Sequence, residues 1–241
     1  MIGRRFRKPL QIFYVLRTGC QWNALNETDL CPSSTAHDRF QWWREEGVFD
    51  RLFDAGLTRY EALRGVDWRF VSVDATMTKA PLGGEKTGPN PTDRGKRGVK
   101  RSIAADARGV PLSVEVEGAN MHDLRMLGMT LLQIEDGAIE RPTPTAERPQ
   151  GLCLDKGYDS AEARELAELF GFVAHIRSRG EEKLAKRQAG RRARRWVVER
   201  THSWMNRFRR LLIRWEKKPE NYLVMLYIAC GFIAFQQAVF E

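Results

Sequence analysis

Near its C-terminal end the chain carries an unbroken run of 14 apolar residues, from Tyr222 to Phe235. A helix made of this run has no polar face, so it must either cross a membrane or lie inside a protein core. A transmembrane helix needs about 20 apolar residues, and here the run is bounded by Asn221 on one side and Gln236 on the other. We therefore expect a buried helix and no membrane association.

The composition is that of a globular protein. The 241 residues suffice for one large domain, or for a domain with a small companion, with a core that needs no disulfides. Apolar residues make up 42% and charged residues 29%, which excludes a disordered tail and a fibre. The four Cys are far apart and form no C-x-x-C pair, which argues against a zinc ribbon or a thioredoxin-like site. Because no secretory signal is visible, we expect reduced thiols in a cytoplasmic protein.

The net charge of +9 is concentrated in one segment. Residues 177–218 contain 16 Lys or Arg against 4 Asp or Glu, a net of +12, whereas the rest of the chain has 24 against 27, a net of −3. A solvated helical face is one interpretation of such a run. Four acids cannot pair sixteen bases, however, and like charges repel at helical spacing. The density therefore favours a polyanion, and nucleic acid in particular, as the partner.

Two patterns divide the chain near residue 67. Residues 1–65 have helical spacing, with a break at Gly47, and either present a helix to DNA or cap the following domain. After that point, short β-type runs begin. The expected strands are 70–74, 102–106, 111–117, 151–155 and 172–177, and the expected helices are 123–134 (capped by Asp123), 159–170, 190–216 and 220–239. This order predicts an α/β fold, a mixed sheet flanked by helices, behind a small helical N-terminal domain.

Two carboxylates follow hydrophobic strands directly. Asp74 comes after Val71-Ser72-Val73, and Asp155 comes after Leu152-Cys153-Leu154. Either residue alone could simply start a turn. At neighbouring strand ends, however, they would lie at a sheet edge where functional sites collect. Carboxylate oxygens are ligands that Mg²⁺ prefers, and two such ions can stabilise the attacking and leaving oxygens of phosphoryl transfer.

A third acid, Glu199, lies in the basic segment RRARRWVVERTHSWMNRFRRLLIRW. On a helix it points away from an apolar stripe and toward cations. The stripe consists of Val197, Trp204, Phe208, Leu211 and Trp215. Glu199 could pair with Arg195 one turn earlier, or it could bind a metal ion among arginines that hold phosphates.

The sequence resembles the DDE transposases of bacterial insertion sequences, specifically the insertion sequence five family. The matching stretches are FYVLRTGCQW, VDAT, GPNPTDRGKRGVKR, LDKGYDS and WVVERTHSWMNRFRRL. The family's glutamate motif is Tyr, two residues, Arg, three residues, Glu, six residues, Lys. Arg195 and Glu199 match it, whereas Arg192 occupies the Tyr position and Asn206 the Lys position. Family members often carry more residues before FYVLRTG, which leaves a truncated N-terminal module as one interpretation beside a complete one.

The resemblance implies an RNase H-like catalytic domain over 67–241 behind a helical DNA-binding domain over 1–66. It implies that Asp74, Asp155 and Glu199 form the catalytic, metal-binding triad, with Mg²⁺ as cofactor and Mn²⁺ as its substitute. The activity implied is cleavage of DNA at the terminal repeats of the element, followed by attack of the 3′-hydroxyl on target DNA. The enzyme is expected to work as a homodimer or larger assembly, in the cytoplasm and on the nucleoid.

Residues 81–101, rich in Gly, Pro and basic residues, are expected to form a long loop. Cations in this basic loop and around Glu199 are expected to hold the DNA backbone, which positions DNA without reading its sequence. His202, one turn from Glu199, is expected to contact DNA or the active site, with a solvated surface position as the alternative. The expected DNA-binding residues are Lys96, Arg97, Lys100, Arg101, Arg192, Arg195, His202, Arg207 and Arg210.

Three other classes of function share features with this sequence. A haloacid dehalogenase-type phosphatase needs an Asp nucleophile where Ser72 stands, which excludes it. A catalytically inactive or truncated DNA-binding regulator of the element is the main alternative. A nuclease that cuts but does not join DNA is the third.

Overall fold

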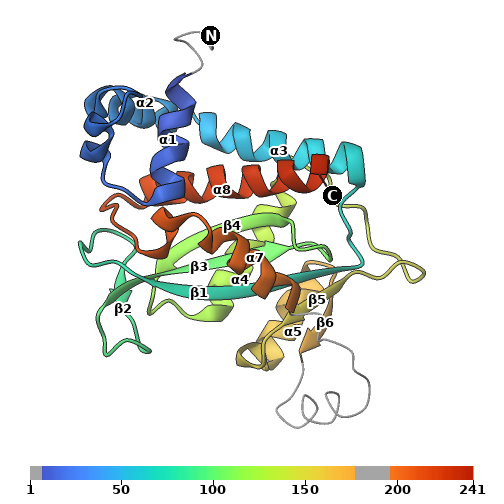
Figure 1. Cartoon of the computed structure of the whole chain (residues 1–241). Helices are drawn as coiled ribbons and strands as arrows, with labels where there is room; N and C mark the ends of the chain where they lie inside the picture. The colour runs from blue at the N-terminus through green and yellow to red at the C-terminus, as the bar shows by residue number, and fades with distance from the viewer. Residues whose placement is uncertain (1–6, 177–195, 241) are drawn as a thin grey trace.

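The computed structural model describes residues 7–176 and 196–240 (Figure 1). The chain starts with three helices, α1 (Arg7–Thr18), α2 (Ser33–Glu45) and α3 (Val48–Arg64), and a 3₁₀ turn η1 (Trp22–Glu27) joins the first two. Gly47 separates α2 from α3 with a φ of 64°, a left-handed conformation that favours glycine. The helical structure predicted for this region, and the break predicted at Gly47, are confirmed for the residues that the structure describes.

A mixed sheet forms the centre of the molecule. Its strands are β1 (Phe70–Lys79), β2 (Gly88–Pro89), β3 (Arg97–Ala105), β4 (Pro111–Gly118), β5 (Gly151–Leu154) and β6 (Val173–Ile176). The order is β2–β3–β1–β5–β6, and β4 also pairs with β3. β1, β3 and β4 are antiparallel neighbours, whereas β1, β5 and β6 are parallel. Leaving aside the two-residue β2, the strands stand in the order third, second, first, fourth and fifth, which is the mixed sheet expected of an RNase H-like core.

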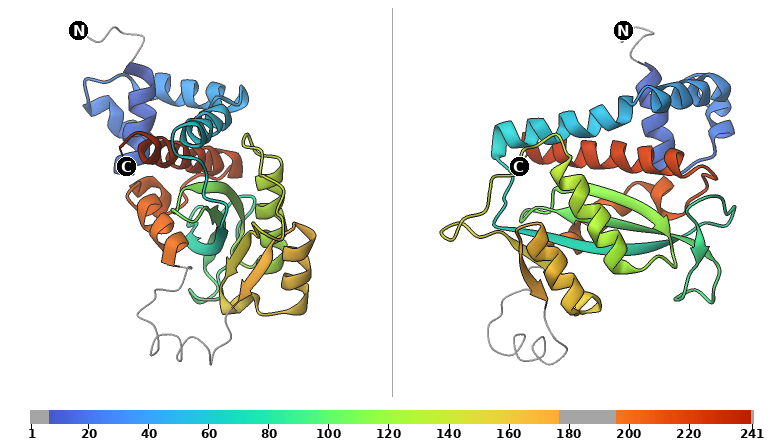
Figure 2. Two further views of the ribbon diagram at one scale, coloured as in Figure 1. Left: turned by 90° about the vertical axis from the view of Figure 1, so that its right-hand side faces the viewer. Right: turned by 180° about the vertical axis from the view of Figure 1, so that it is seen from behind.

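Helices cover both faces of this sheet (Figure 2). Successive residues of a strand point to opposite faces. On β3, Ser102 accepts a hydrogen bond from Thr130 of α4 (Asp123–Glu135), whereas its neighbour Arg101 donates one to Asn206 of α7 (Trp196–Asn206). Helix α4 therefore lies on one face, next to α5 (Ala161–Leu169), and α7 lies on the other.

Helix α8 (Pro219–Phe240) contains the apolar run and lies between α3 and β4 (Figure 1). By length and composition it could cross a membrane, but 61% of its most apolar 18-residue stretch is buried inside the protein. Its residues share one hydrophobic core with the sheet and with α1, α2 and α3. The structure therefore agrees with the prediction of a core helix. The division at residue 66 stays a prediction.

The structure corrects four predicted elements. The strand predicted over 102–106 is β3, which starts at Arg97, because its first half pairs with β1 and β4. β1 continues to Lys79 instead of ending at Asp74, because β3 pairs with it along its whole second half. The helix predicted over 190–216 ends at Asn206 within the described residues, and a separate 3₁₀ turn η3 (Arg209–Leu212) follows. Helix α4 is capped by the Nδ1 of His122, which accepts from the Leu124 amide, and not by Asp123.

Candidate functional site

Asp74 lies on β1, and Asp155 directly follows β5, the strand that pairs in parallel with β1. The parallel pairing of β1 with β5 joins Phe70 to Gly151 and ends with Ser72 opposite Cys153. Asp74 is two residues beyond Ser72 on β1, and Asp155 is two residues beyond Cys153, directly after the end of β5. The contact with His202 places the Asp74 side chain on the face that α7 covers. Asp155 caps the short turn η2 (Lys156–Tyr158), and its Oδ1 accepts a hydrogen bond of 2.6 Å from the Lys156 amide.

Tyr158, at the end of this turn, lies close to both carboxylates. The pKa of its hydroxyl is raised, first by burial and then by the charges of Asp123, Asp74 and Asp155. The side chain is buried, and its hydroxyl has no hydrogen-bond partner within 7–176 and 196–240. Tyr158 was not among the predicted site residues, although it belongs to the LDKGYDS stretch.

Helix α7 carries the third predicted acid, Glu199. The helix is fixed on the β3–β4 turn, where the Thr201 hydroxyl donates to the Gly109 carbonyl oxygen and the Arg200 guanidinium donates to that of Arg108. Glu199 is exposed. One turn later, on the same side of the helix, the Nε2 of the buried His202 lies 3.5 Å from the Oδ2 of Asp74. Glu199 is therefore one helical turn from a residue that contacts Asp74.

His202 is a buried, neutral side chain at physiological pH. Burial, and next the positive charge of Arg101, lower the pKa of its imidazole to about 3, although Asp74 acts in the opposite direction. Neither ring nitrogen has a hydrogen-bond partner within the described ranges. This position excludes the solvated surface histidine that the sequence left open.

The three acids do not form a closed metal site in this structure. Among residues 7–176 and 196–240, no group of three His, Cys, Asp or Glu side chains is arranged to hold a metal ion. The donor chemistry nevertheless fits Mg²⁺ and Mn²⁺, because Asp74, Asp155 and Glu199 all offer carboxylate oxygens, the ligands that these ions prefer. Their assignment as the catalytic triad stays a prediction.

The predicted DNA-binding residues separate by exposure. Lys96, Arg97 and Arg207 are exposed. Arg192 and Arg195 lie outside the described residues. The remaining cations, Lys100, Arg101 and Arg210, are buried, with exposed fractions of 5%, 1% and 7%.

Each buried cation has internal partners. The Nζ of Lys100 donates to Asp123 Oδ1 at 2.6 Å and to the Met121 carbonyl oxygen. Arg101 donates to Asn206, and Arg210 donates to Glu216. The structure therefore corrects the prediction for these three cations, because it places them in buried, internally bonded positions and not on an open backbone-binding surface.

A family model described as a transposase DDE domain matches residues 67–231, and a second, for transposases of the IS4/5 family, matches residues 7–53. The chain belongs to the DDE transposase family. The resemblance seen in the sequence is thus confirmed. The transposase is also 39% identical over 156 residues to a protein of Burkholderia cepacia named as a transposase for insertion sequence element IS402, a match that covers 63% of this chain and 69% of that protein.

Two solved structures also show similarity. The Mos1 transposase catalytic domain with raltegravir and Mn has 10% identity and a TM-score of 0.31, over 66% of the transposase and 92% of that chain. The Mos1 mariner paired-end complex with Mn has 10% identity and a TM-score of 0.33, over 88% and 79%. Because both the sequence identities and the TM-scores are low, the fold is assigned from the strand order described above and not from these two structures.

Proposed function

We propose that this transposase cuts DNA at the ends of its insertion sequence and joins the freed 3′-hydroxyl to target DNA. The observation that carries the proposal is the arrangement around Asp74. Asp155 directly follows β5, the parallel neighbour of the strand that carries Asp74, and both carboxylates act on the buried Tyr158 hydroxyl. His202 contacts Asp74 from the helix that bears Glu199. Both reaction steps are in-line phosphoryl transfers, so one site serves both.

Asp74, Asp155 and Glu199 are the residues that would hold Mg²⁺, with Mn²⁺ as a substitute. A divalent ion in such a site polarises the scissile phosphate and lowers the pKa of a bound water. The protein contributes the positions of the oxygen donors. The Lys156 amide holds one oxygen of Asp155, and the neutral imidazole of His202 lies against Asp74 without adding a positive charge that would compete with the ion.

The exposed cations Lys96, Arg97 and Arg207 hold the DNA backbone, together with Arg192 and Arg195. The helices of residues 1–66 read the end sequence, and residues 67–241 perform the chemistry. Two ends must be brought together in one complex, so the transposase acts as a homodimer or larger assembly. It does so in the cytoplasm, on the DNA of the nucleoid.

The test uses duplexes that carry the terminal sequences of the element, with Mg²⁺, Mn²⁺ or neither. We expect metal-dependent nicking and then joining to a target plasmid by the wild type. Asp74→Asn, Asp155→Asn and Glu199→Gln should each abolish both steps while DNA binding is retained. Asp136→Asn, which changes an exposed carboxylate at the far end of α4, is the matched control and should keep full activity.

Each alternative function predicts a different result. Binding to the ends without any cleavage by the wild type would identify a DNA-binding regulator. Cleavage without joining would identify a nuclease. Cleavage that survives Asp155→Asn would refute the proposed site.

A further inference from the structure

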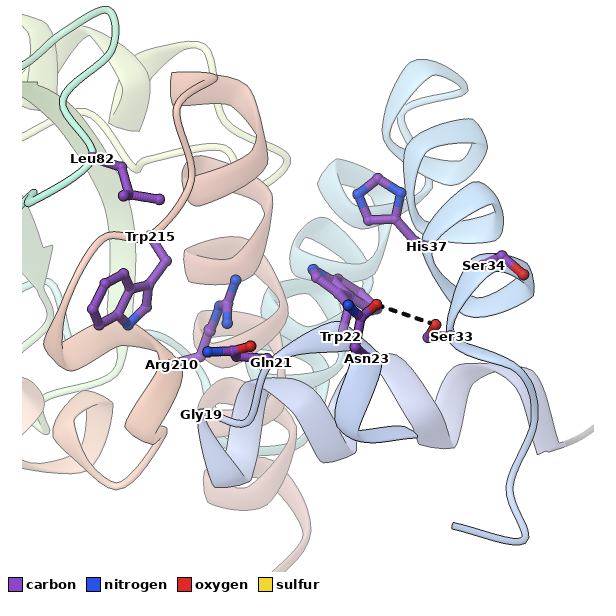
Figure 3. A pocket seen from close by; sticks show the side chains of 10 residues that line it. All are labelled: Gly19, Gln21, Trp22, Asn23, Ser33, Ser34, His37, Leu82, Arg210 and Trp215. Atoms are coloured by element: carbon purple, nitrogen blue, oxygen red, sulfur yellow. Dashed lines mark hydrogen bonds between the residues drawn. The ribbon is translucent and has the colours of Figure 1, made fainter. Parts of the chain in front are cut away.

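A pocket of about 660 Å³ lies between the N-terminal helices and the segment that follows η3 (Figure 3). Its size is within the range of small-ligand sites, about 300–1,000 Å³. One side is lined by Trp22 and His37 from η1 and α2, and the other by Trp215 and Leu82. Residues far apart in the sequence thus form two opposing walls.

Both walls present aromatic or apolar surface to the solvent. Trp215 is 41% exposed and Leu82 is 51% exposed, although each is large and hydrophobic. On the opposite wall, the rings of Trp22 and His37 meet edge to face at 5.3 Å, and Trp22 also packs on Phe40. Trp22 and His37 therefore hold each other in place before any ligand binds.

Arg210 lies between these walls, next to Gln21 (Figure 3). Its Nε donates to Glu216 Oε1 at 2.7 Å and its Nη1 donates to the Cys20 carbonyl oxygen at 3.1 Å. These two bonds fix the plane of the guanidinium group. Its Nη2 makes no hydrogen bond to any residue in the described part of the chain. The pocket therefore combines stacking surfaces with a fixed hydrogen-bond donor.

The pocket is adjacent to residues proposed to hold the DNA backbone. Leu82 lines a second, open hollow as well, together with Arg97. Leu82 thus borders both the pocket and the hollow beside Arg97, so a strand held at Arg97 would lie near the mouth of the pocket. Backbone contacts there would bring bases within reach of Trp215.

We propose that this pocket binds one unpaired base of DNA, stacked on Trp215 and hydrogen-bonded by Arg210. The inference rests on the proposed function, because it takes DNA as the partner. Every base has a face that stacks on an aromatic ring, and a guanidinium donates to base-edge acceptors. A paired base in a duplex has both faces covered by its neighbours, so only an extruded or single-stranded base can enter.

The experiment compares two non-specific duplexes of one sequence, identical except for a single bulged base in one of them, without divalent ions. We expect the wild type to bind the bulged duplex about tenfold more tightly, the size of effect that one stacked base produces. Trp215→Ala should remove this preference and leave the affinity for the paired duplex unchanged. Trp215→Phe should retain most of it. With 2-aminopurine as the bulged base, its fluorescence should be quenched by the wild type but not by Trp215→Ala.

Trp42→Ala is the matched control, because Trp42 is 48% exposed on α2 and does not line the pocket. Whatever it does to overall affinity, the ratio between the two duplexes should stay at its wild-type value. Equal binding of both duplexes by the wild type would overturn the inference and leave the proposed function standing. Absence of DNA binding to either duplex would overturn both.

Discussion

Tyr158 has a buried hydroxyl surrounded by carboxylates that come from three separate elements. Asp74 lies on β1, Asp155 follows β5, and Asp123 starts α4. Asp123 is held in turn by Lys100 from β3. The two aspartates of the predicted triad were identifiable from the hydrophobic strands before them. The contact between Lys100 and Asp123 could not be predicted, because it joins residues 23 positions apart and no local pattern encodes it.

Replacing Tyr158 with Phe should not destabilise the fold. Removing a buried hydroxyl that has no partner removes a desolvation cost, so the free energy of unfolding should stay the same or rise. Urea denaturation measures this. Tyr222→Phe is the matched comparison, since the Tyr222 hydroxyl is also buried but donates to the Leu211 carbonyl oxygen, and its loss should cost about 1 kcal/mol. A larger loss for Tyr158→Phe than for Tyr222→Phe would contradict this.

At the scale of elements, most helices and strands could be predicted because their signals are local. Gly47 and the capping Ser160, whose hydroxyl accepts from the Ala163 amide, mark helix boundaries in the sequence itself. The end of α7 has no such signal. The chain after Asn206 is held by α1 and its C-terminal turn, because Arg17 donates to the Arg207 carbonyl oxygen and Arg210 donates to that of Cys20. Tertiary contacts therefore end a helix that local spacing would continue.

The crossing of α3 and α8 depends on two glycines. A Cβ on Gly56 would lie 2.6 Å from the Gly231 carbonyl oxygen, and a Cβ on Gly231 would lie 3.0 Å from that of Leu52. Backbone atoms cannot move aside as a flexible side chain can. Gly56→Ala should therefore force the helices apart and lower the free energy of unfolding by about 1–3 kcal/mol.

Gly128→Ala is the control for this prediction. Gly128 is also helical, but a Cβ there would meet nothing closer than a Leu166 methyl group at 3.8 Å. Alanine should raise the free energy of unfolding by about 0.5–1 kcal/mol, because it loses less backbone entropy on folding. Thermal or urea denaturation of both variants checks the pair. Equal effects of the two substitutions would show that the glycine contact does not control the crossing.

At the scale of the whole molecule, some of the basic side chains predicted to bind DNA are buried and others are exposed. Burial could not be predicted for Lys100 and Arg101, because β3 lies within a basic stretch that looks like an exposed loop. Lys96 and Arg97, at the start of that strand, remain exposed. They lie at the opposite end of the sheet from the 136–150 connection, which carries the exposed Arg148 (Figure 1).

The salt dependence of DNA binding should therefore change when Lys96 and Arg97 are replaced, but not when Arg148 at the opposite end of the sheet is replaced. Each phosphate contact contributes about 0.9 to the slope of log affinity against log salt concentration. Replacing both Lys96 and Arg97 with Gln should reduce the magnitude of that slope by about 2, measured by fluorescence anisotropy. Arg148→Gln should leave it unchanged. A slope that falls equally in both proteins would mean that the DNA track is elsewhere.

The account depends above all on Asp74, Asp155 and Glu199 meeting at one divalent ion. Fe²⁺ can occupy a site with oxygen ligands, and with ascorbate and peroxide it produces hydroxyl radicals that cut the nearby backbone. We expect fragments that end close to positions 74, 155 and 199. Excess Mg²⁺ and the Asp155→Asn substitution should suppress them, and Asp136→Asn should not. Cuts near 74 and 155 with an intact chain around Glu199 would contradict the account.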